Sequence, residues 1–359
     1  MSADTLELER PRGDALARAL QGGQMSRTAV WGVVAFTLAA SIVLTFPVLH
    51  IGPVAAVLVT APIVIVGTWA VSRAVEGARR ATDRLMTMLV VTAFALAIAP
   101  LVSVLWTVVQ NGLARFDAQF FTSDMRGVIG EGGGALHAIM GTLLITSAAA
   151  VISVPIGILT AIYLVEYGRG ALARWITMLV DVMTGIPSIV AGLFAFALFR
   201  IFFGPAIRFG IGGAVALSVM MIPIVVRTTE EMLRIVPNDL REASYALGVP
   251  KWRTVVQVVL PAAASGISAG VIVAVARIIG ETAPLLIIAG ATTNLNFNLF
   301  SGRMATLPVF TFVSYAQPGF PPEAAKDRAW AAALTLMLLV MILNLVARLI
   351  ARLLAPKTA

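Results

Sequence analysis

The sequence predicts an all-α polytopic membrane protein with about eight spans. Of its 359 residues, 59% are hydrophobic and only 12% are charged, whereas a soluble domain carries roughly 25% charged residues. Apolar stretches near the length of a membrane-crossing helix recur along the chain, since roughly 20 helical residues cross a ~30 Å hydrocarbon layer. A soluble protein could not keep this much apolar surface in solution, so that class is excluded.

The apolar segments define the expected domain organisation. They run over about 29–49, 51–72, 85–109, 136–165, 175–203, 209–226, 262–289 and 329–347. The first two are separated only by "LHIGP" and predict a tight transmembrane hairpin. The expected units are a cytoplasmic tail over 1–28, the hairpin over 29–72, a cytoplasmic basic linker over 73–84 and a main transmembrane domain over 85–355. The tail has no apolar centre and is not interpreted as a signal peptide.

Basic residues predict the orientation of the spans. Most of the 26 Lys and Arg residues fall in the tail, in 73–84, in 227–261 and after the last span. Loops rich in Lys and Arg face the cytoplasm, so both termini are expected there. The net charge of +8 therefore flanks the spans and predicts contact with membrane lipid, not with nucleic acid.

The residue inventory excludes several kinds of site. There is no cysteine, which removes disulfides, thiolate catalysis and Cys-based metal sites. The two histidines, His50 and His137, lie far apart in sequence near span ends and are interpreted as interfacial side chains. No metal, cofactor or catalytic residue is predicted. The chain also lacks a GxxxxGK[ST] phosphate loop, so an ATP-driven activity would need a separate ATPase.

Residues 227–261 form the longest predicted cytoplasmic connection, and they contain a short helix at about 238–248. Asn238 or Asp239 is expected to cap its start. Gly248 suits a left-handed helix terminus and Pro250 prevents continuation. The apolar residues of this helix share one stripe: Leu240, Ala243 and Leu247.

The same connection resembles the signature loop of ABC-importer permeases. The match is Glu242-Ala243-Ser244, then Gly248, then Val258-Val259-Leu260-Pro261, with Ser244 and Val258 departing conservatively from Ala and Ile. In that family the loop is a coupling helix that docks on a separate ATPase subunit. The resemblance therefore implies a set of coupling residues: Arg241, Glu242, Ala243, Ser244, Gly248 and Pro250.

Longer stretches narrow the resemblance to the PstA subunits of bacterial phosphate importers. They are "VVRTTEEMLRIVPNDLREASYALGVPKWRT", "ARIIGETAPLL", "GIPSIVAGLF", "AIYLVEYGR" and "EGGGALHAI". The resemblance implies a six-helix type I permease core, to which the hairpin at 29–72 is an addition, in the bacterial plasma (inner) membrane. It implies a heterodimer with a PstC-like permease, a PstB-like ATPase dimer and an extracytoplasmic PstS-like phosphate-binding protein.

The segment "AVARIIGETAPLL" places a full positive charge in an apolar span. Arg277 falls near the midpoint of 262–289, where an Arg costs about 2.5–3.5 kcal/mol to insert. Glu281 is four residues later and is expected to share a helix face with Arg277. A guanidinium binds two oxygens of an oxyanion at once. We therefore expect Arg277, Glu281 and Thr282 to line the translocation path, although a structural ion pair to neighbouring spans remains open.

Three other functions are weighed. A permease for another oxyanion, such as molybdate or sulfate, would share the coupling loop. A secondary transporter would show inverted repeats with paired broken helices, and no clear repeat is seen. A membrane enzyme would need clustered catalytic groups, of which Glu166 and Asp181 are the nearest approximation. Two local features are interpreted as structural. Gly266 and Gly270 predict close packing of two helices, and Pro187 predicts a bend in its span.

Overall fold

The computed structural model describes residues 27–43, 53–205 and 207–354. The chain divides into two compact units, Met1–Leu105 and Trp106–Ala359, which are described separately. Within the described residues the regular structure is entirely helical, which confirms the all-α class.

The first unit contains two helices in the region of the expected hairpin. Helix α2 (Arg27–Val43) packs against α3 (Pro53–Glu76), and the connection over 44–52 lies outside the described residues. A single residue, Gly77 at φ +87°, separates α3 from α4 (Ala78–Gly112). The Arg84 guanidinium donates to the Glu76 carboxylate at 2.6 and 2.8 Å across this turn. Residues 73–84, expected as a linker, are therefore almost wholly helical.

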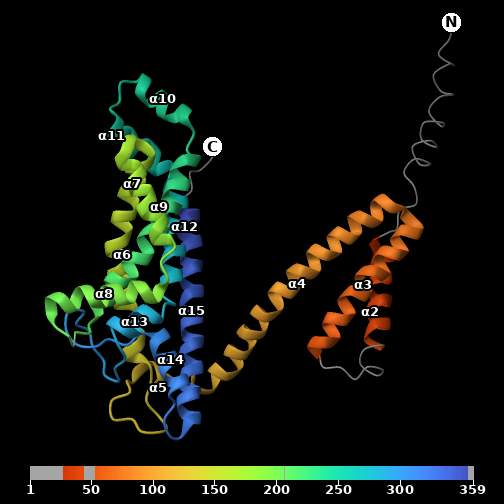
Figure 1. The fold of residues 1–359 in the computed structure, drawn as a ribbon, viewed down its shortest axis with the longest axis horizontal. Helices are drawn as coiled ribbons and strands as arrows, with labels where there is room; N and C mark the ends of the chain where they lie inside the picture. The colour runs from red at the N-terminus through yellow and green to blue at the C-terminus, as the bar shows by residue number, and fades with distance from the viewer. Residues whose placement is uncertain (1–26, 44–52, 206, 355–359) are drawn as a thin grey trace. The chain divides into compact units, whose positions relative to one another are not determined.

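The second unit is a bundle of helices (Figure 1). Its elements are η3 (Leu113–Arg115), α5 (Ala118–Thr122), α6 (Leu136–Ile162), the π-turn η4 (Tyr163–Tyr167), α7 (Gly170–Thr184), α8 (Ser188–Phe203), α9 (Gly210–Ile235), α10 (Asn238–Ala246), α11 (Lys251–Thr254), the π-turn η5 (Val255–Val259), α12 (Leu260–Ile278), α13 (Ala283–Ile288), α14 (Leu307–Ala316) and α15 (Pro322–Leu354). Within this unit α10 lies at one end, whereas α5 and the start of α15 lie at the other.

The core of this unit forms where α9 packs between α6 and α12. Ile145, Leu217, Met221 and Ile278 are fully buried there. Gly266 and Gly270 lie on α12 against α9, and a Cβ built at Gly270 would lie only 2.8 Å from Thr228 Cβ. The predicted packing role of the two glycines is confirmed, because side chains there would push the helices apart.

Three of the predicted spans differ from the observed helices. The span at 175–203 is two helices, α7 and α8, that meet at 109°. Pro187 immediately precedes α8, as the bent-span prediction required. The span at 209–226 continues as α9 to Ile235, so the start of the predicted 227–261 connection is wrong. The span at 262–289 ends at Ile278 and resumes as α13 only at Ala283.

The number of spans is compatible with a multi-pass membrane protein but does not settle the predicted eight. Among the described residues, six helices are long and apolar enough to cross a membrane, or seven if α7 and α8 together form one span. Helix α2, with 17 described residues, is not one of them. The eighth span therefore stays a prediction.

Candidate functional site

Arg277 lies at a break in the helix, not at the middle of one. It occupies the last turn of α12, which ends at Ile278, and its side chain is exposed. The Glu281 backbone N–H donates to the Ile278 carbonyl at 3.1 Å, and α13 starts two residues later. The prediction that Arg277 and Glu281 share one helix face is therefore wrong. Within the described residues Arg277 has no ion pair or hydrogen bond.

The break is held in place by a second interrupted helix. Helix α13 packs against α8, which itself follows the 109° bend after α7. At the contact a Cβ built at Gly192 would lie 2.5 Å from Pro284 Cα, so only glycine permits this approach. Two helix interruptions thus adjoin each other in the bundle. Where helices are interrupted, backbone groups lose their helical partners and become available to a path through the protein.

Thr282 faces a cavity beside the same break. The cavity has a volume of about 480 Å³ and is lined by Gly280, Thr282 and the aromatic side chains of Phe312, Tyr315 and Trp330, among others. Arg277 is not among its lining residues. The structure therefore brings Thr282 and Arg277 to the same helix interruption, but it does not place both side chains in one cavity.

Helix α10 forms where the sequence predicted a short helix, with differences at its start. Its N-cap is Pro237, and no side chain caps the helix, so the expected capping by Asn238 or Asp239 is wrong. Its end agrees with the prediction: Gly248 adopts φ +74°, and its N–H donates to the Tyr245 carbonyl at 2.9 Å. Pro250 then caps α11.

Most of α10 is exposed. Among the implied coupling residues, Glu242, Ala243, Gly248 and Pro250 face outward. The predicted apolar stripe is also uncovered, with Leu240 44% and Leu247 83% exposed. A helix whose apolar residues have no cover inside its own chain presents a surface that another protein can bind.

Arg241, by contrast, anchors α10 to the bundle. Its Nε and Nη2 donate to Glu166 Oε1 at 3.0 and 2.9 Å, and it also donates to the carbonyls of Leu233 and Val236 at 2.9 and 2.6 Å. The two charged side chains are only 11% and 5% exposed. Glu166 belongs to the π-turn η4 that ends α6. The anchor therefore joins α10 to both α6 and the end of α9.

A second contact fixes the far end of α10. Ser244 is buried, and its hydroxyl is 2.8 Å from the Thr254 hydroxyl of α11. The Lys251 ammonium lies 5.0 Å from the centre of the Tyr167 ring in η4. The serine that departs from the alanine of the family signature thus has a local function here, since alanine could not make this hydrogen bond.

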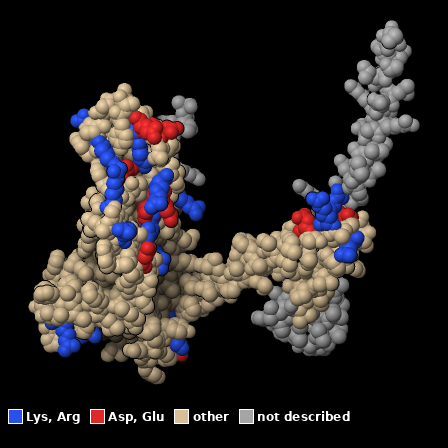
Figure 2. Space-filling view, turned by 45° about the horizontal axis from the view of Figure 1, so that its top comes forward, with Lys and Arg blue, Asp and Glu red and all other residues tan. Residues whose placement is uncertain are grey.

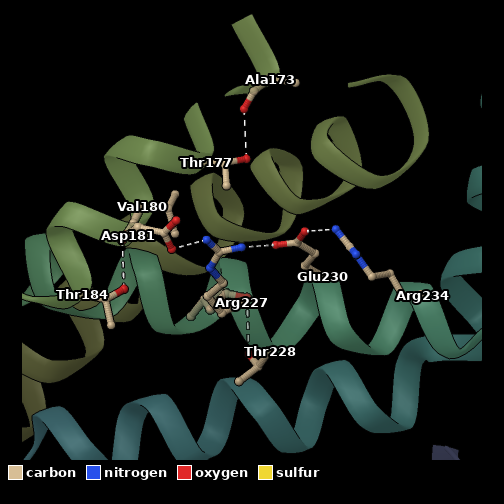
Figure 3. Close-up of polar contacts among 10 residues, drawn as sticks. Ala173, Thr177, Val180, Asp181, Thr184, Arg227, Thr228, Glu230 and Arg234 are labelled. Carbon is tan, nitrogen blue, oxygen red and sulfur yellow. Dashed lines mark hydrogen bonds and ion pairs between the residues drawn. The ribbon is translucent and has the colours of Figure 1, made fainter. Parts of the chain in front are cut away.

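A chain of four charged side chains, three on α9 and one on α7, lies nearby (Figure 3). Arg227 donates to Asp181 on α7 and, at 2.8 Å, to Glu230, and Arg234 donates to Glu230 at 2.5 Å. Glu230 is nearly buried, whereas Asp181 and Arg234 are exposed. Figure 2 shows charged side chains of both signs gathered toward the α10 end of this unit. The network ties α7 to α9 just before the connection that leads to α10.

Sequence reasoning missed this network and the anchor for different reasons. Arg227, Glu230 and Arg234 have the i, i+3 and i, i+4 spacing of a helix face, which could have shown that α9 continues. No sequence signal pairs Glu166 with Arg241, because the two residues are 75 positions apart. Among the described residues there is no group of three or more His, Asp or Glu side chains that could hold a metal ion.

Comparisons with known proteins bear on the second unit above all. Residues 153–359 match the family of binding-protein-dependent transport system inner membrane components. The phosphate transport system permease protein PstA of Mycobacterium leprae (strain TN) is 45% identical over 274 residues, which cover 75% of this chain and 88% of the relative. PstA of Pasteurella multocida (strain Pm70) is 38% identical over 262 residues, which cover 72% and 91%.

A third relative is PstA 1 of Mycobacterium tuberculosis (strain ATCC 25618 / H37Rv), 45% identical over 264 residues, which cover 73% of this chain and 84% of the relative. Among solved structures, an inward-facing MetNI methionine ABC transporter aligns with 62% of this chain and 95% of its own at a TM-score of 0.49 and 21% identity. On the sequence matches, the chain belongs to the PstA family of phosphate transport system permease proteins, within the binding-protein-dependent inner membrane components.

Proposed function

We propose that this chain is the permease subunit of an ATP-driven importer and passes inorganic phosphate through the plasma membrane into the cytoplasm. The main support for this proposal is Arg277. Its guanidinium is exposed at the interruption between α12 and α13 and has no ion-pair partner within the described residues. The family relatives are phosphate transport permeases. A planar guanidinium can hold two phosphate oxygens, and an interrupted helix leaves it free to do so.

The role of Glu281 changes with this geometry. An Arg277–Glu281 ion pair on one helix would have weakened the hold on an anion. Because α12 ends between the two residues, they do not share a helix face, and within the described residues no ion pair joins them. Glu281 and the hydroxyl of Thr282 then belong to the path as neighbours of the anion site. Release of phosphate follows from movement of α13 relative to α12, which changes the surroundings of Arg277.

The coupling proposal rests on the exposed α10. A PstB-like ATPase dimer binds the outward face that includes Glu242, Ala243 and Leu247. Arg241 and Ser244 pass the movement of α10 into the bundle, because Arg241 is bonded to Glu166 and Ser244 to Thr254. Motion of a short rigid helix is thereby converted into motion of α6 and α12, a shift of packed elements. The chain itself contributes no ATP hydrolysis.

The remaining partners follow from the same family. A PstC-like permease completes the pore as a heterodimer, and a PstS-like protein delivers phosphate on the side opposite α10. The α10 end faces the cytoplasm, as do both termini, because basic residues gather there. The hairpin of α2 and α3 is additional to the six-helix core.

Uptake by the reconstituted complex tests the role of Arg277. The complete importer, with its binding protein, is placed in vesicles, and phosphate uptake and ATP hydrolysis are measured for Arg277→Ala and Arg277→Lys. Loss of uptake in Arg277→Ala is expected, with part of it retained in Arg277→Lys. Arg348→Ala, which removes another exposed arginine, serves as the control. Normal uptake by an intact Arg277→Ala complex would refute the proposal.

A further inference from the structure

A cavity at the end of the second unit opposite α10 is lined by two buried polar side chains that have nitrogen atoms without hydrogen-bond partners among the described residues. It has a volume of about 410 Å³, within the range of roughly 300–1,000 Å³ typical of ligand pockets. His137, at the start of α6, and Arg328, on the first turns of α15, both line it. Its lining residues come mainly from the loop between α5 and α6 and from α14 with the segments that flank it.

His137 is the first unsatisfied group. Sequence position suggested an interfacial side chain, but the residue is only 2% exposed. Among the residues that the structure describes, neither ring nitrogen has a hydrogen-bond partner. The ring is held by an edge contact with Phe310, whose ring centre lies 5.3 Å away. A buried polar group without a partner costs roughly 1–3 kcal/mol, so a ligand that bonded to the ring would recover that energy.

Arg328 is the second group, and its free edge has a specific shape. The residue is 6% exposed. Nη1 donates to the carbonyls of Gly130 and Gly132 at 2.7 and 3.0 Å, which fixes the guanidinium against the glycine-rich loop. Within the described part of the chain, Nε is buried without a partner and Nη2 makes no hydrogen bond. The Nε–Nη2 edge is one of the two forks by which arginine binds two oxygens of one anion.

The charges around the cavity do not by themselves attract an anion. Arg115 adds positive charge near Arg328, while Asp327 and Asp124 add negative charge. Asp124 already accepts from the backbone N–H groups of Arg126 and Leu295, at 3.1 and 3.3 Å. Hydrogen bonding from Arg126 N–H lowers the pKa of Asp124, so it remains ionised and is no donor. Any selectivity of the site must come from the placement of donors.

We propose that this cavity binds a small oxyanion, a phosphate group supplied either by free inorganic phosphate or by a lipid headgroup. The Nε–Nη2 edge of Arg328 takes two of its oxygens, and a ring nitrogen of His137 donates to a third. The site is separate from the helix interruption at Arg277, which lies outside this cavity. It does not depend on the transport role proposed for Arg277.

Histidine nitrogen signals give a direct test, because the chain has only two histidines. The full chain with His50→Gln and Arg277→Ala, labelled with ¹⁵N-histidine, is placed in phosphatidylcholine nanodiscs, so that His137 alone is observed and Arg277 cannot bind the anion. Addition of inorganic phosphate should shift the His137 ring signals saturably. A parallel sample with phosphatidic acid in the nanodisc tests the headgroup source: a shift there and none with free phosphate assigns the lipid.

Variants separate recognition from folding. Arg328→Lys keeps a charge and a donor for the glycine carbonyls but loses the fork, so binding should weaken roughly 10- to 100-fold. Arg126→Lys, an exposed arginine at the same end that contacts Asn294, should leave binding unchanged. His137→Phe keeps the ring contact with Phe310 and should weaken phosphate binding measured by calorimetry. The proposal is overturned if neither phosphate source shifts His137, or if Arg328→Lys binds as tightly as the parent.

Discussion

Replacing Glu166 by Gln removes the charge that Arg241 faces at the base of α10 and leaves the shape of the side chain almost unchanged. Removing one partner of a buried ion pair costs about 3–5 kcal/mol in soluble proteins. Arg241 retains the carbonyls of Leu233 and Val236 at 2.9 and 2.6 Å, so we expect a smaller loss of about 2–3 kcal/mol. Because α10 has few other contacts, the loss should appear as local opening of residues 238–246.

Amide hydrogen exchange of the full chain in nanodiscs measures that opening. A loss of 2–3 kcal/mol corresponds to exchange roughly 30- to 150-fold faster in α10, with unchanged rates in the middle of α6. Glu231→Gln, at an exposed carboxylate of α9, is the matched control. In the complete importer the Glu166→Gln variant should hydrolyse more ATP per phosphate imported, because a loosened α10 transmits movement poorly.

A double-variant cycle isolates the pair. The double variant Arg241→Met/Glu166→Leu removes both charges. Its loss in the free energy of opening α10 should therefore be smaller, by roughly 1–3 kcal/mol, than the sum of the losses in Arg241→Met alone and Glu166→Leu alone. If Glu166→Gln leaves exchange in α10 unaltered, or if the two single costs simply add, the anchor does not hold this helix.

Four further substitutions probe other contacts. Gly248→Ala forces a Cβ into φ +74° at a cost of about 1–2 kcal/mol, and should raise ATP hydrolysis per phosphate imported; an unchanged ratio would argue against a coupling role for this turn. Gly270→Leu, where even a Cβ would crowd Thr228, should destabilise the protein by about 1–3 kcal/mol, seen as a lower Tm; an unaltered Tm would contradict close packing of α9 and α12. Glu230→Gln should lower the Tm more than Asp181→Asn, because Glu230 is nearly buried and Asp181 is exposed and screened; the reverse order would show that the tie to α7 dominates.

The class of the protein and the short helix at α10 were predictable from sequence because both rest on local signals. Apolar length identifies the spans, and Gly248 with Pro250 marks the end of α10 through backbone geometry alone. The interruption after Ile278 was not predicted. The stretch around Arg277 is apolar on both sides, so hydropathy predicts one span there, although the stretch contains Gly280 and Pro284.

The contacts that position the candidate sites mostly join residues far apart in the chain, and such contacts cannot be predicted from a single sequence. Arg241 was assigned to the coupling surface through a family signature, which records where a residue occurs but not which way it faces. His137 was placed at an interface from its position near a span end, whereas its burial depends on Phe310 from a distant helix. Paired broken helices, together with inverted repeats, were expected of a secondary transporter. Two adjoining interruptions occur here in a PstA-family chain, so that feature does not separate the two classes.

The π-turn η4 is bonded to α10 through Glu166 and Arg241, and the π-turn η5 directly follows α11. Each π-turn holds one residue more than a regular helical turn would. Deleting a single residue from 255–259 would let the backbone close into an unbroken α-helix without loss of ladder bonds. That same deletion would rotate everything before it by about 100° around the axis of α12. Chain length in this short stretch is therefore constrained by the direction in which α10 faces, and not by the requirement to remain helical.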